Sequence, residues 1–372
     1  MKVAIVCDWL LGTGGAERVV LELHKMFPGA PIYTSQYNKN PKIWFGDKWF
    51  EDADVRTTWL QKLPKGLKKF LPVLRAWTFS RLNLDNYDLV ISSSGAEAKF
   101  VKPKALHITY CHSPTHYYWS RHNEYLKNPG FGRLDPLARL ALKVLARPMR
   151  RWDYKAAQRP DYFIANSNYT KGQIKKYYGR EATVIHPPID IKRFEVRGSR
   201  FEVRKRRGFV TAGRQVPYKK IDLAVKAATK LNVPLVVIGR GPDHAKLKRL
   251  AGRSVTFLTN VSDEEMPEKF TGAEAFIFPG IDDFGIVAVE ALAAGTPVIA
   301  YGAGGALDYV NKDTGILFEE QTVESLTQAL EEFRKKELDN EAISKQAEKF
   351  SARVFAQKTS SFIDKVCYNR DK

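Results

Sequence analysis

The chain has 372 residues, of which 44% are hydrophobic and 27% charged, so it is long enough for two globular domains and has the composition of a folded protein. No apolar run approaches the roughly 20 residues of a membrane-spanning helix, and the three cysteines lack the spacing of zinc sites or disulfide frameworks, which favours a reducing cytoplasm. The formal net charge of +19 is concentrated in the first half, since residues 1–187 carry 30 Lys and Arg against 15 Asp and Glu. A basic half attracts nucleic acid, anionic membrane or a diphosphate ligand.

Short apolar runs alternate with helix-like segments, which predicts α/β domains with parallel sheets. The N-terminal MKVAIVCDWL is expected to be a buried strand rather than a signal peptide, because its apolar stretch is short and includes Asp8. Strands in the first half are expected at Val3–Asp8, Ile32–Thr34, Asp88–Ser92, Ala105–Cys111, Tyr162–Asn166 and Thr183–His186. Strands in the second half are expected at Phe209–Gly213, Leu235–Gly239, Val255–Leu258, Ala275–Pro279 and Pro297–Tyr301.

The strand–helix pattern restarts once, after a Pro-Pro pair at 187–188 and the basic, turn-rich stretch VRGSRFEVRKRRG. We therefore predict two doubly wound, Rossmann-like domains. The N-terminal domain is expected over 1–187 and the second over 188–350. A helix over 351–372 is expected to pack back on the N-terminal domain.

The first candidate site is the glycine loop LGTGGAER after the first strand, which opens a helix ending near Phe27. Glycines let the backbone approach a ligand closely, and amides at a helix N-terminus attract anions. The spacing is not GxGxxG, and the second strand segment PIYTSQYN offers no acidic residue, so a dinucleotide cofactor is disfavoured. A tight turn without a ligand is the alternative for this loop.

Two more candidate sites follow predicted strands, at the edge where open α/β sheets bind ligands. His112 stands in YCHSP, where a histidine merely satisfied by its neighbours is the alternative. Arg214 and Lys219 stand in GRQVPYK, ahead of a helix whose N-terminus favours anions, so the two cations suit a diphosphate. The alternative is that one of them is an ordinary solvated charge, as Lys220 is expected to be.

The strongest motif is FPGIDDFGIVAVEALAAGTPVIAYGAGG, in which a strand, a loop and a helix from about Gly285 to Ala294 follow one another. Asp282 lies in the loop and Glu290 more than one turn inside the helix. The two carboxylates suit hydroxyls at opposite ends of an elongated ligand whose phosphates lie at the helix N-terminus. Since Glu290 lies within an apolar run, where an unpaired charge is costly, it requires a specific partner.

Together, the last three motifs, with VVIGRGP and VSDEE, resemble family 4 of the retaining glycosyltransferases, and the resemblance covers nearly the whole chain. The residues of these motifs are most similar to those of bacterial mannosyltransferases of O-antigen and surface-polysaccharide assembly. The resemblance implies the GT-B fold, in which two Rossmann-like domains face each other across a cleft. It also implies a hexosyltransferase with no cofactor, whose nucleotide-sugar donor is preferably GDP-mannose and whose acceptor is a glycan or a polyprenyl-linked glycan.

Residue roles follow from the resemblance by position. Gly14 and Gly15 would offer backbone amides to the donor phosphates, and His112 would hydrogen-bond the transferred sugar. Arg214 and Lys219 would bind the diphosphate and stabilise it as it leaves.

The same resemblance assigns the rest of the donor site. Backbone amides that would contact sugar and phosphate belong to Phe284, Gly285, Ile286 and Val287. Val261 would contact the base through its backbone, and Glu290 would bind the ribose hydroxyls. Asp282 stands where the family normally has Glu, so its contact to the sugar needs a shifted backbone or a water, and the adjacent Asp283 is the alternative.

The implied mechanism is retaining and independent of divalent metal, and the sequence has no DxD placed after a strand as a metal clamp. Transfer is expected on the front face through an oxocarbenium-like state, with the departing phosphate helping to deprotonate the acceptor.

Basic amphipathic segments with aromatic residues at 59–82 and 136–152 suit an anionic membrane interface. They predict a cytoplasmic protein bound peripherally to the inner face of the plasma membrane. Surface helices packed on their own domain are the alternative.

Two rival functions are weighed against glycosyl transfer. A sugar-nucleotide epimerase or hydrolase on the same fold would bind the same donor without an acceptor. A nucleic-acid-binding protein would account for the charge but leaves the Asp282 and Glu290 pair unexplained, so no nucleic-acid partner is expected.

Overall fold

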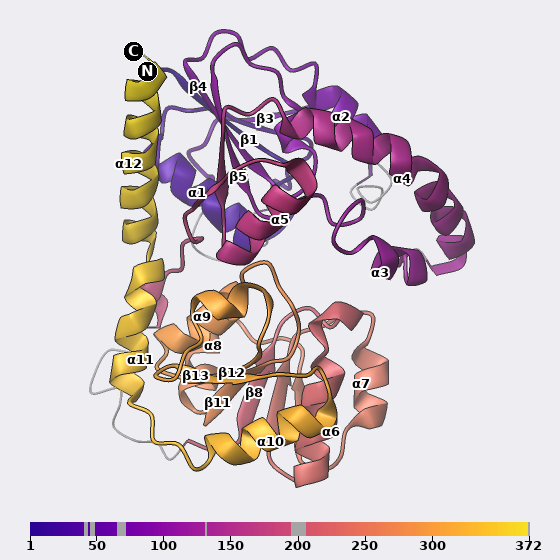
Figure 1. Ribbon diagram of the computed structural model, residues 1–372, viewed down its shortest axis with the longest axis vertical. Helices are drawn as coiled ribbons and strands as arrows, with labels where there is room; N and C mark the ends of the chain where they lie inside the picture. Colours follow the sequence, from indigo (N-terminus) through magenta and orange to yellow (C-terminus); the bar gives the residue numbers. More distant parts are fainter. Residues whose placement is uncertain (41–43, 45–48, 65–71, 131, 195–205, 371–372) are drawn as a thin grey trace. The chain divides into compact units, whose positions relative to one another are not determined.

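The computed structural model describes residues 1–40, 44, 49–64, 72–130, 132–194 and 206–370, drawn in colour in Figure 1. The chain forms two compact units, of which unit 1 comprises Met1–Pro188 and Phe355–Lys372 and unit 2 comprises Ile189–Val354. Each unit holds a parallel sheet with apolar clusters on both faces. The predicted α/β class with two doubly wound, Rossmann-like domains is therefore confirmed.

The sheet of unit 1 has seven strands in the order β3-β2-β1-β4-β5-β6-β7. The strands are β1 (Val3–Cys7), β2 (Ile32–Thr34), β3 (Val55–Thr57), β4 (Leu89–Ser94), β5 (Leu106–Cys111), β6 (Tyr162–Ala165) and β7 (Thr183–Val184). Because the order reverses between β1 and β4, the topological switch point lies at the carboxyl ends of these two strands. The loops that follow β1 and β4 therefore meet where doubly wound sheets bind ligands.

Helices cover both faces of this sheet because successive strand residues point to opposite sides. Val3, Ile5 and Cys7 of β1 pack with α1 and α12, whereas Ala4 and Val6 pack with α2 and α4. The helices of unit 1 are α1 (Gly15–Met26), α2 (Pro72–Phe79), α3 (His122–Lys127), α4 (Asp135–Ala157), α5 (Asn168–Tyr178) and α12 (Ala352–Arg370).

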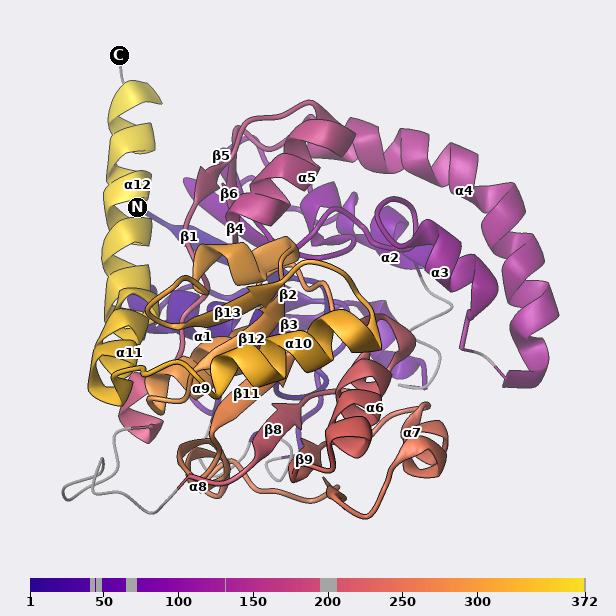
Figure 2. The same cartoon turned by 60° about the horizontal axis from the view of Figure 1, so that its bottom comes forward.

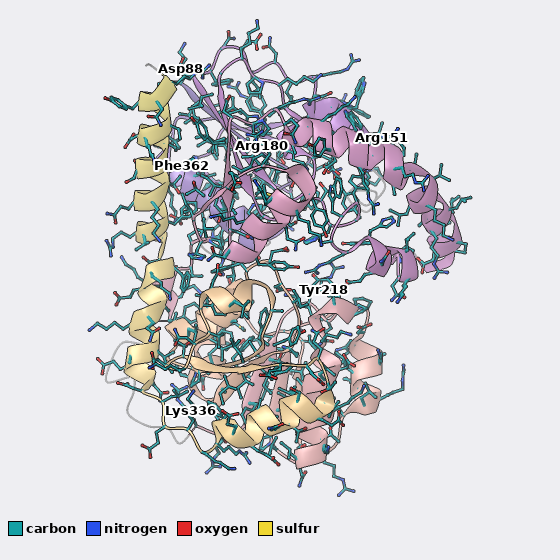
Figure 3. The ribbon with its side chains drawn as sticks, viewed as in Figure 1. Asp88, Arg151, Arg180, Tyr218, Lys336 and Phe362 are labelled. Carbon is teal, nitrogen blue, oxygen red and sulfur yellow. The ribbon has the colours of Figure 1, made fainter. Side chains whose placement is uncertain are left out.

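Helix α12 returns from unit 2 to unit 1 and covers one face of its sheet (Figure 1). Phe355 contacts the Tyr110 ring at a centroid distance of 5.9 Å, and Phe362 contacts the Tyr162 ring at 6.0 Å. Figure 3 shows Phe362 on the side of α12 that faces this sheet. The C-terminal helix thus supplies part of the core of unit 1.

Helix α4 changes character at Pro148, which lies in its interior and removes one helix hydrogen bond. Three residues that follow Pro148 are buried: Met149, Asp153 and Ala156. Before Pro148, the apolar side chains of Leu140 and Val144 are exposed to solvent, at 59% and 64% of their full accessible surface. Figures 1 and 2 both show the N-terminal half of α4 extending away from the sheet of unit 1.

Among the described residues, no helix combines the length and apolar character needed to cross a bilayer.

Unit 2 contains a six-stranded parallel sheet in the order β10-β9-β8-β11-β12-β13, so its switch point lies between β8 and β11. The strands are β8 (Phe209–Ala212), β9 (Leu235–Ile238), β10 (Val255–Leu258), β11 (Ala275–Phe278), β12 (Val298–Tyr301) and β13 (Gly315–Phe318). One face is covered by α6 (Ile221–Leu231), α7 (His244–Leu250) and α10 (Val323–Phe333). The other is covered by α8 (Met266–Thr271), α9 (Ile286–Ala293) and α11 (Asn340–Ala347).

Two strands were not predicted from the sequence, and both are edge strands. β3 has three residues, two of which are exposed polar side chains, so it lacks a continuous apolar run. β13 has four residues and begins at Gly315, which lies against the backbone of Val298. Backbone pairing with β2, rather than an apolar pattern, identifies β3 as a strand, whereas β13 pairs with β12 through a short apolar run that the sequence analysis did not select.

A buried histidine is expected to make unit 1 sensitive to acid. His107 of β5 is buried, with Nε2 2.9 Å from Ser92 Oγ, and burial together with the Arg159 charge lowers the pKa of its imidazole from 6.5 to about 3. Between these two values the unfolded chain binds a proton that the folded chain does not, so stability is lost as the pH falls below 6.5. At pH 5 the expected loss is about 2 kcal/mol relative to neutral pH.

This loss can be measured by urea unfolding followed by tryptophan fluorescence, because all seven tryptophans belong to unit 1. His107→Gln removes the titrating group and is expected to flatten the stability profile between pH 6.5 and pH 5. Equal slopes for the wild type and His107→Gln would show that other groups cause the acid sensitivity.

Candidate functional site

The predicted donor residues of unit 2 gather around the switch point between β8 and β11. The loop after β8 carries Arg214 and ends in the short 3₁₀ helix Pro217–Lys219, which contains Lys219 and also Tyr218, the residue labelled in Figure 3. The loop after β11 carries Asp282 and leads into α9. The fold thus brings two segments that are distant in the sequence to one edge of the sheet.

Lys219 and Asp282 form an ion pair that joins these two loops. The side chains are 20% and 13% exposed, so the pair lies at the surface of the loops but is largely shielded. The Lys219 ammonium also lies 5.7 Å from the centroid of the Phe278 ring. Because an ammonium has three N–H donors, Lys219 can hold Asp282 and still donate to a phosphate oxygen.

Arg214 lies on the same loop but is exposed, and its side chain makes no hydrogen bond or ion pair within the described part of the chain. An uncommitted guanidinium beside a helix N-terminus is suited to an anionic ligand. The two predicted phosphate cations are therefore different, since Lys219 is held in place and Arg214 projects from the loop.

Gly280 allows the close approach of the two loops. A β-carbon at this position would lie 2.7 Å from Lys219 Cα and 2.8 Å from the carbonyl oxygens of Tyr218 and Lys219. These are backbone atoms, which have little freedom to move away. Only glycine at position 280 therefore lets the backbone of Lys219 pack against the segment that leads to Asp282.

Helix α9 is preceded by its N-cap residue Gly285, whose backbone φ of +94° favours glycine. Phe284 is buried against Tyr309 and Phe350, so only its backbone is available to a ligand, as the prediction for this residue requires. Ile286 and Val287 form the first turn of the helix and are partly exposed. The segment predicted to offer backbone amides therefore lies at the N-terminal end of α9 and follows Asp282 directly in the chain.

The sequence did not point to Tyr309. Its hydroxyl is buried and has no hydrogen-bond partner among the described residues, and it would lie 2.5 Å from a β-carbon added to Gly285. Burial raises the pKa of this hydroxyl well above its usual range. The phenol thus occupies the space that a side chain at position 285 would need.

Glu290 is 6% exposed and lies in the second turn of α9, among apolar residues. Burial of this carboxylate requires a partner of opposite charge, and Arg193 is one such partner. Its Nη1 is 4.0 Å from Glu290 Oε1. The Arg193 guanidinium also donates from Nη2 to the carbonyl oxygen of Asp263 at 3.0 Å. Asp263 follows Val261, the predicted base contact, in the loop after β10, so Arg193 connects the predicted ribose and base positions.

The predicted site residues of unit 1 lie at the carboxyl edge of its own sheet. Gly14 is the N-cap of α1, Gly15 is the first residue of that helix, and His112 directly follows β5. The His112 ring is partly satisfied, since Nε2 lies 2.8 Å from Ser93 Oγ. Glu17 Oε2 would lie 2.6 Å from a β-carbon on Gly14, so an anion at this helix end would meet a carboxylate.

Buried charges that the sequence did not single out fix the loops of this edge. The Asp8 carboxylate accepts backbone N–H groups from the loop after β4, at 2.8 Å from Gly95 and 2.6 Å from Ala98. Glu97 of the same loop forms a buried ion pair with Arg75 at 2.7 Å, and burial raises the pKa of the Glu97 carboxyl. These contacts hold the two switch-point loops of unit 1 in one arrangement.

Within the described ranges, no group of three or more His, Cys, Asp or Glu side chains is placed to hold a metal ion. Transfer without a divalent metal and without a cofactor stays a prediction.

Two family models match adjacent parts of the chain. Residues 13–193 match the model described as Glycosyltransferase Family 4, and residues 192–350 match the model described as Glycosyl transferases group 1. The chain belongs to glycosyltransferase family 4. The predicted resemblance is thereby confirmed.

Curated relatives of this family 4 protein include mannosyltransferases. It is 31% identical over 191 residues to a GDP-mannose-dependent monoacylated alpha-(1-6)-phosphatidylinositol monomannoside mannosyltransferase of Corynebacterium glutamicum, a match that covers 44% of this chain and 50% of the relative. It is also 31% identical over 175 residues to a D-inositol 3-phosphate glycosyltransferase of Streptomyces scabiei, a match that covers 39% of each chain. The chain spans about half the length of the curated relatives it matches.

Solved structures share the fold along nearly the whole chain. HepE of Anabaena in complex with UDP superposes with a TM-score of 0.70 at 17% identity, over 98% of this chain and 100% of the other. Sucrose-phosphate synthase of Thermosynechococcus elongatus superposes with a TM-score of 0.69 at 15% identity, over 99% and 100%. The GT-B architecture of the family 4 protein is thus established by its fold and its family.

Proposed function

We propose that this family 4 protein is a retaining hexosyltransferase that moves mannose from GDP-mannose to a glycan or polyprenyl-linked acceptor during surface-polysaccharide synthesis. The observation that carries the proposal is the Lys219–Asp282 pair at the β8/β11 switch point, directly ahead of the α9 N-terminus. A cation and backbone amides meet there, as the departing diphosphate of a sugar nucleotide requires. The relatives named for GDP-mannose support the choice of donor.

Each group has a chemical role in this proposal. Arg214, Lys219 and the amides from Phe284 to Val287 stabilise the negative charge that grows on the diphosphate as the bond to the sugar breaks. Asp282, held by Lys219, accepts hydroxyl hydrogen bonds from the sugar, and His112 hydrogen-bonds the same sugar. A departing phosphate oxygen takes the proton of the acceptor hydroxyl on the face that the leaving group vacates, which retains the anomeric configuration.

The donor is tested first by thermal unfolding with GDP-mannose, UDP-glucose and ADP-glucose. A ligand present at a hundred times its Kd stabilises the folded state by about 2.7 kcal/mol, so the true donor is expected to give the largest rise in Tm. A rise with UDP-glucose or ADP-glucose alone would replace the donor, and no rise with any nucleotide sugar would reject the proposed function.

The reaction is tested by incubation of GDP-mannose with and without an acceptor extract. We expect mannose transfer only with the acceptor and an α-configured product in the NMR spectrum. Free mannose or an epimerised nucleotide sugar without acceptor would instead indicate the hydrolase or epimerase alternative.

We further propose that unit 1 binds the inner face of the plasma membrane through α2 and α4, both of which contact the short helix Ala98–Phe100. Most exposed large apolar side chains of the described residues occur in α2, in α4 or directly before α4: Val73, Leu74, Trp77, Leu134, Leu137, Leu140, Val144 and Leu145. The exposed Trp59 ring is attached to α2, since its Nε1 donates to Thr78 Oγ1 at 3.0 Å. The exposed cations of α4 include Arg139, Lys143, Arg147 and Arg151, the last labelled in Figure 3. Exposed apolar and basic side chains on one helix suit an anionic lipid surface. Residues 65–71 of the first amphipathic segment lie outside the described residues.

Vesicle sedimentation tests this association. Arg139→Ser, Lys143→Ser and Arg147→Ser combined are expected to weaken binding to phosphatidylcholine–phosphatidylglycerol vesicles by about 10²-fold, since each surface cation contributes about 1 kcal/mol. The matched control removes three exposed cations from α12, at Arg353, Lys358 and Lys365, and is expected to bind more tightly than the α4 variant. Equal binding to vesicles with and without phosphatidylglycerol would contradict the proposal.

A further inference from the structure

Gln215 directly follows Arg214, and its side chain is fully buried although it is polar. The amide Nε2 donates to the carbonyl oxygen of Gly239 at 2.8 Å, and the amide Oε1 lies 2.7 Å from His244 Nδ1. Because an amide oxygen can only accept, His244 Nδ1 carries the hydrogen of this second bond. Both polar ends of the buried side chain are therefore satisfied by the segment that follows β9.

The backbone of Gln215 is tied to the same segment. Its N–H donates to the carbonyl oxygen of Arg240 at 2.9 Å, and its carbonyl oxygen accepts from the N–H of Asp243 at 3.1 Å. A β-carbon added to Gly241 would lie 2.1 Å from that carbonyl oxygen, so the two loops are in direct backbone contact. Gln215 is thus fastened to residues 239–244 through its backbone as well as its side chain.

The segment that receives Gln215 is itself fixed. His244 is the first residue of α7, and its ring meets the Phe257 ring of β10 edge to face at a centroid distance of 5.5 Å. Arg240 donates from Nε to the carbonyl oxygen of Thr259, in the loop after β10, at 3.0 Å. Since β10 and its loop hold the segment after β9, this segment is a firm support for Gln215.

The two predicted phosphate cations are held by different contacts. Lys219 forms an ion pair with Asp282, which belongs to the loop after β11. The Arg214 side chain is exposed, and its carbonyl oxygen accepts from the N–H of Val216 at 2.9 Å, which makes a tight turn. Gln215 is the middle residue of this turn, so its anchor determines where Arg214 leaves the loop.

We infer that Gln215 is a positioning residue for the donor diphosphate, because it fixes the backbone from which Arg214 reaches the phosphates. The inference rests on the proposed function, which assigns the diphosphate of a sugar nucleotide to Arg214. Gln215 is buried and acts without touching the ligand. It keeps the turn from moving, so the guanidinium is already placed when the diphosphate binds and when negative charge develops on it. Lys219 has its own anchor in Asp282 and depends less on this turn.

The inference predicts that Gln215 and Arg214 act together on the nucleotide. Gln215→Met keeps a side chain of similar length but removes the amide, so the turn loses its two side-chain hydrogen bonds. We expect GDP binding, measured by calorimetric titration, to weaken about tenfold, as for the loss of a hydrogen bond to a charged group. Arg214→Ala is expected to weaken it by a similar factor. Gln215→Met added to Arg214→Ala is expected to cost less than about twofold more, because the guanidinium that Gln215 places is then absent.

His244→Phe tests the anchor from its other side. Phenylalanine keeps an aromatic ring beside Phe257 but has no Nδ1–H to donate to Gln215. The bond from Gln215 to Gly239 remains, so the expected loss of GDP affinity lies between those of the wild type and Gln215→Met. This loss, too, is expected to disappear in the Arg214→Ala background.

Thr296 provides a matched control for the loss of buried hydrogen bonds. Its hydroxyl is fully buried, donates to the carbonyl oxygen of Phe270 at 2.7 Å and accepts from Arg206 Nη1 at 3.0 Å. Thr296 precedes β12, so it lies at the amino edge of the sheet, opposite to the loop of Arg214. Thr296→Val removes two buried hydrogen bonds from unit 2, as Gln215→Met does, and is expected to leave the GDP affinity within about twofold of the wild type.

The outcomes separate this inference from the function on which it rests. If the wild type binds none of GDP, UDP and ADP, the proposed function fails and the inference fails with it; if UDP or ADP binds more tightly than GDP, it replaces GDP in the cycle. If the wild type binds the nucleotide and Gln215→Met keeps that affinity, or its loss adds fully to that of Arg214→Ala, the proposed function stands and the positioning role is overturned.

Equal losses in Gln215→Met and Thr296→Val would also overturn the positioning role, because the effect would then be one of stability alone. Should Gln215→Met fail to fold, His244→Phe gives the same cycle with Arg214→Ala.

Discussion

Arg214→Ala is expected to lower kcat for mannose transfer by about 10²–10³-fold, because it removes a cation from the diphosphate at the moment when negative charge develops on it. The folded state does not depend on this side chain, which is exposed and makes no hydrogen bond or ion pair within the described part of the chain. We therefore expect the Tm in the absence of ligand to stay unchanged. Initial rates with GDP-mannose and acceptor, together with thermal unfolding, measure both quantities.

The neighbouring Lys220 provides the control. It is exposed and adopts a left-handed backbone conformation with φ of +52°, which asparagine also tolerates. Lys220→Asn thus removes one positive charge from the same loop without a new backbone strain. We expect transfer close to that of the wild type, whereas equal losses in Arg214→Ala and Lys220→Asn would indicate only a general effect of net charge. Wild-type turnover in Arg214→Ala would reject the assigned role.

The sheets could be predicted because most of their strands are continuous apolar runs. PLVVIGR and AFIFPG are covered by helices on both faces, and such burial leaves a direct trace in composition. Edge strands such as Val55–Thr57 leave no such trace, because one side of the backbone and most of their side chains remain exposed. Their pairing is set by neighbouring strands, which only the three-dimensional arrangement supplies.

The candidate site was predicted in its parts but not in its connections. The apolar surroundings of Glu290 indicated that it needs a partner, yet nothing in the sequence selected Arg193 from among many cations. Likewise, Lys219 and Asp282 were assigned to phosphate and sugar separately, and the structure shows that they pair with each other. Such pairs join loops that are far apart in the chain, so they cannot be predicted from local sequence patterns.

Gly280→Ala is expected to affect both the stability of unit 2 and the chemistry, because an added β-carbon would meet the backbone of Tyr218 and Lys219 at 2.7–2.8 Å. Relief of this overlap requires the two loops to separate, at an expected cost of about 1–3 kcal/mol. The displacement moves the Lys219 ammonium away from its ion pair with Asp282. A shift of about 1 Å in a positioning group can lower the rate about 10²-fold, so transfer is expected to fall by a similar factor.

Hydrogen exchange of the β8 and β11 amides would follow the stability of unit 2, since tryptophan fluorescence reports on unit 1. Gly172→Ala is the matched control, because it lies inside α5 and its β-carbon would have no neighbour within 4 Å. That control is expected to stabilise unit 1 by about 0.5–1 kcal/mol and to leave transfer unchanged, as alanine favours the helix over glycine. If Gly280→Ala kept the exchange rates and kcat of the wild type, the close packing of these two loops would have no part in placing Lys219.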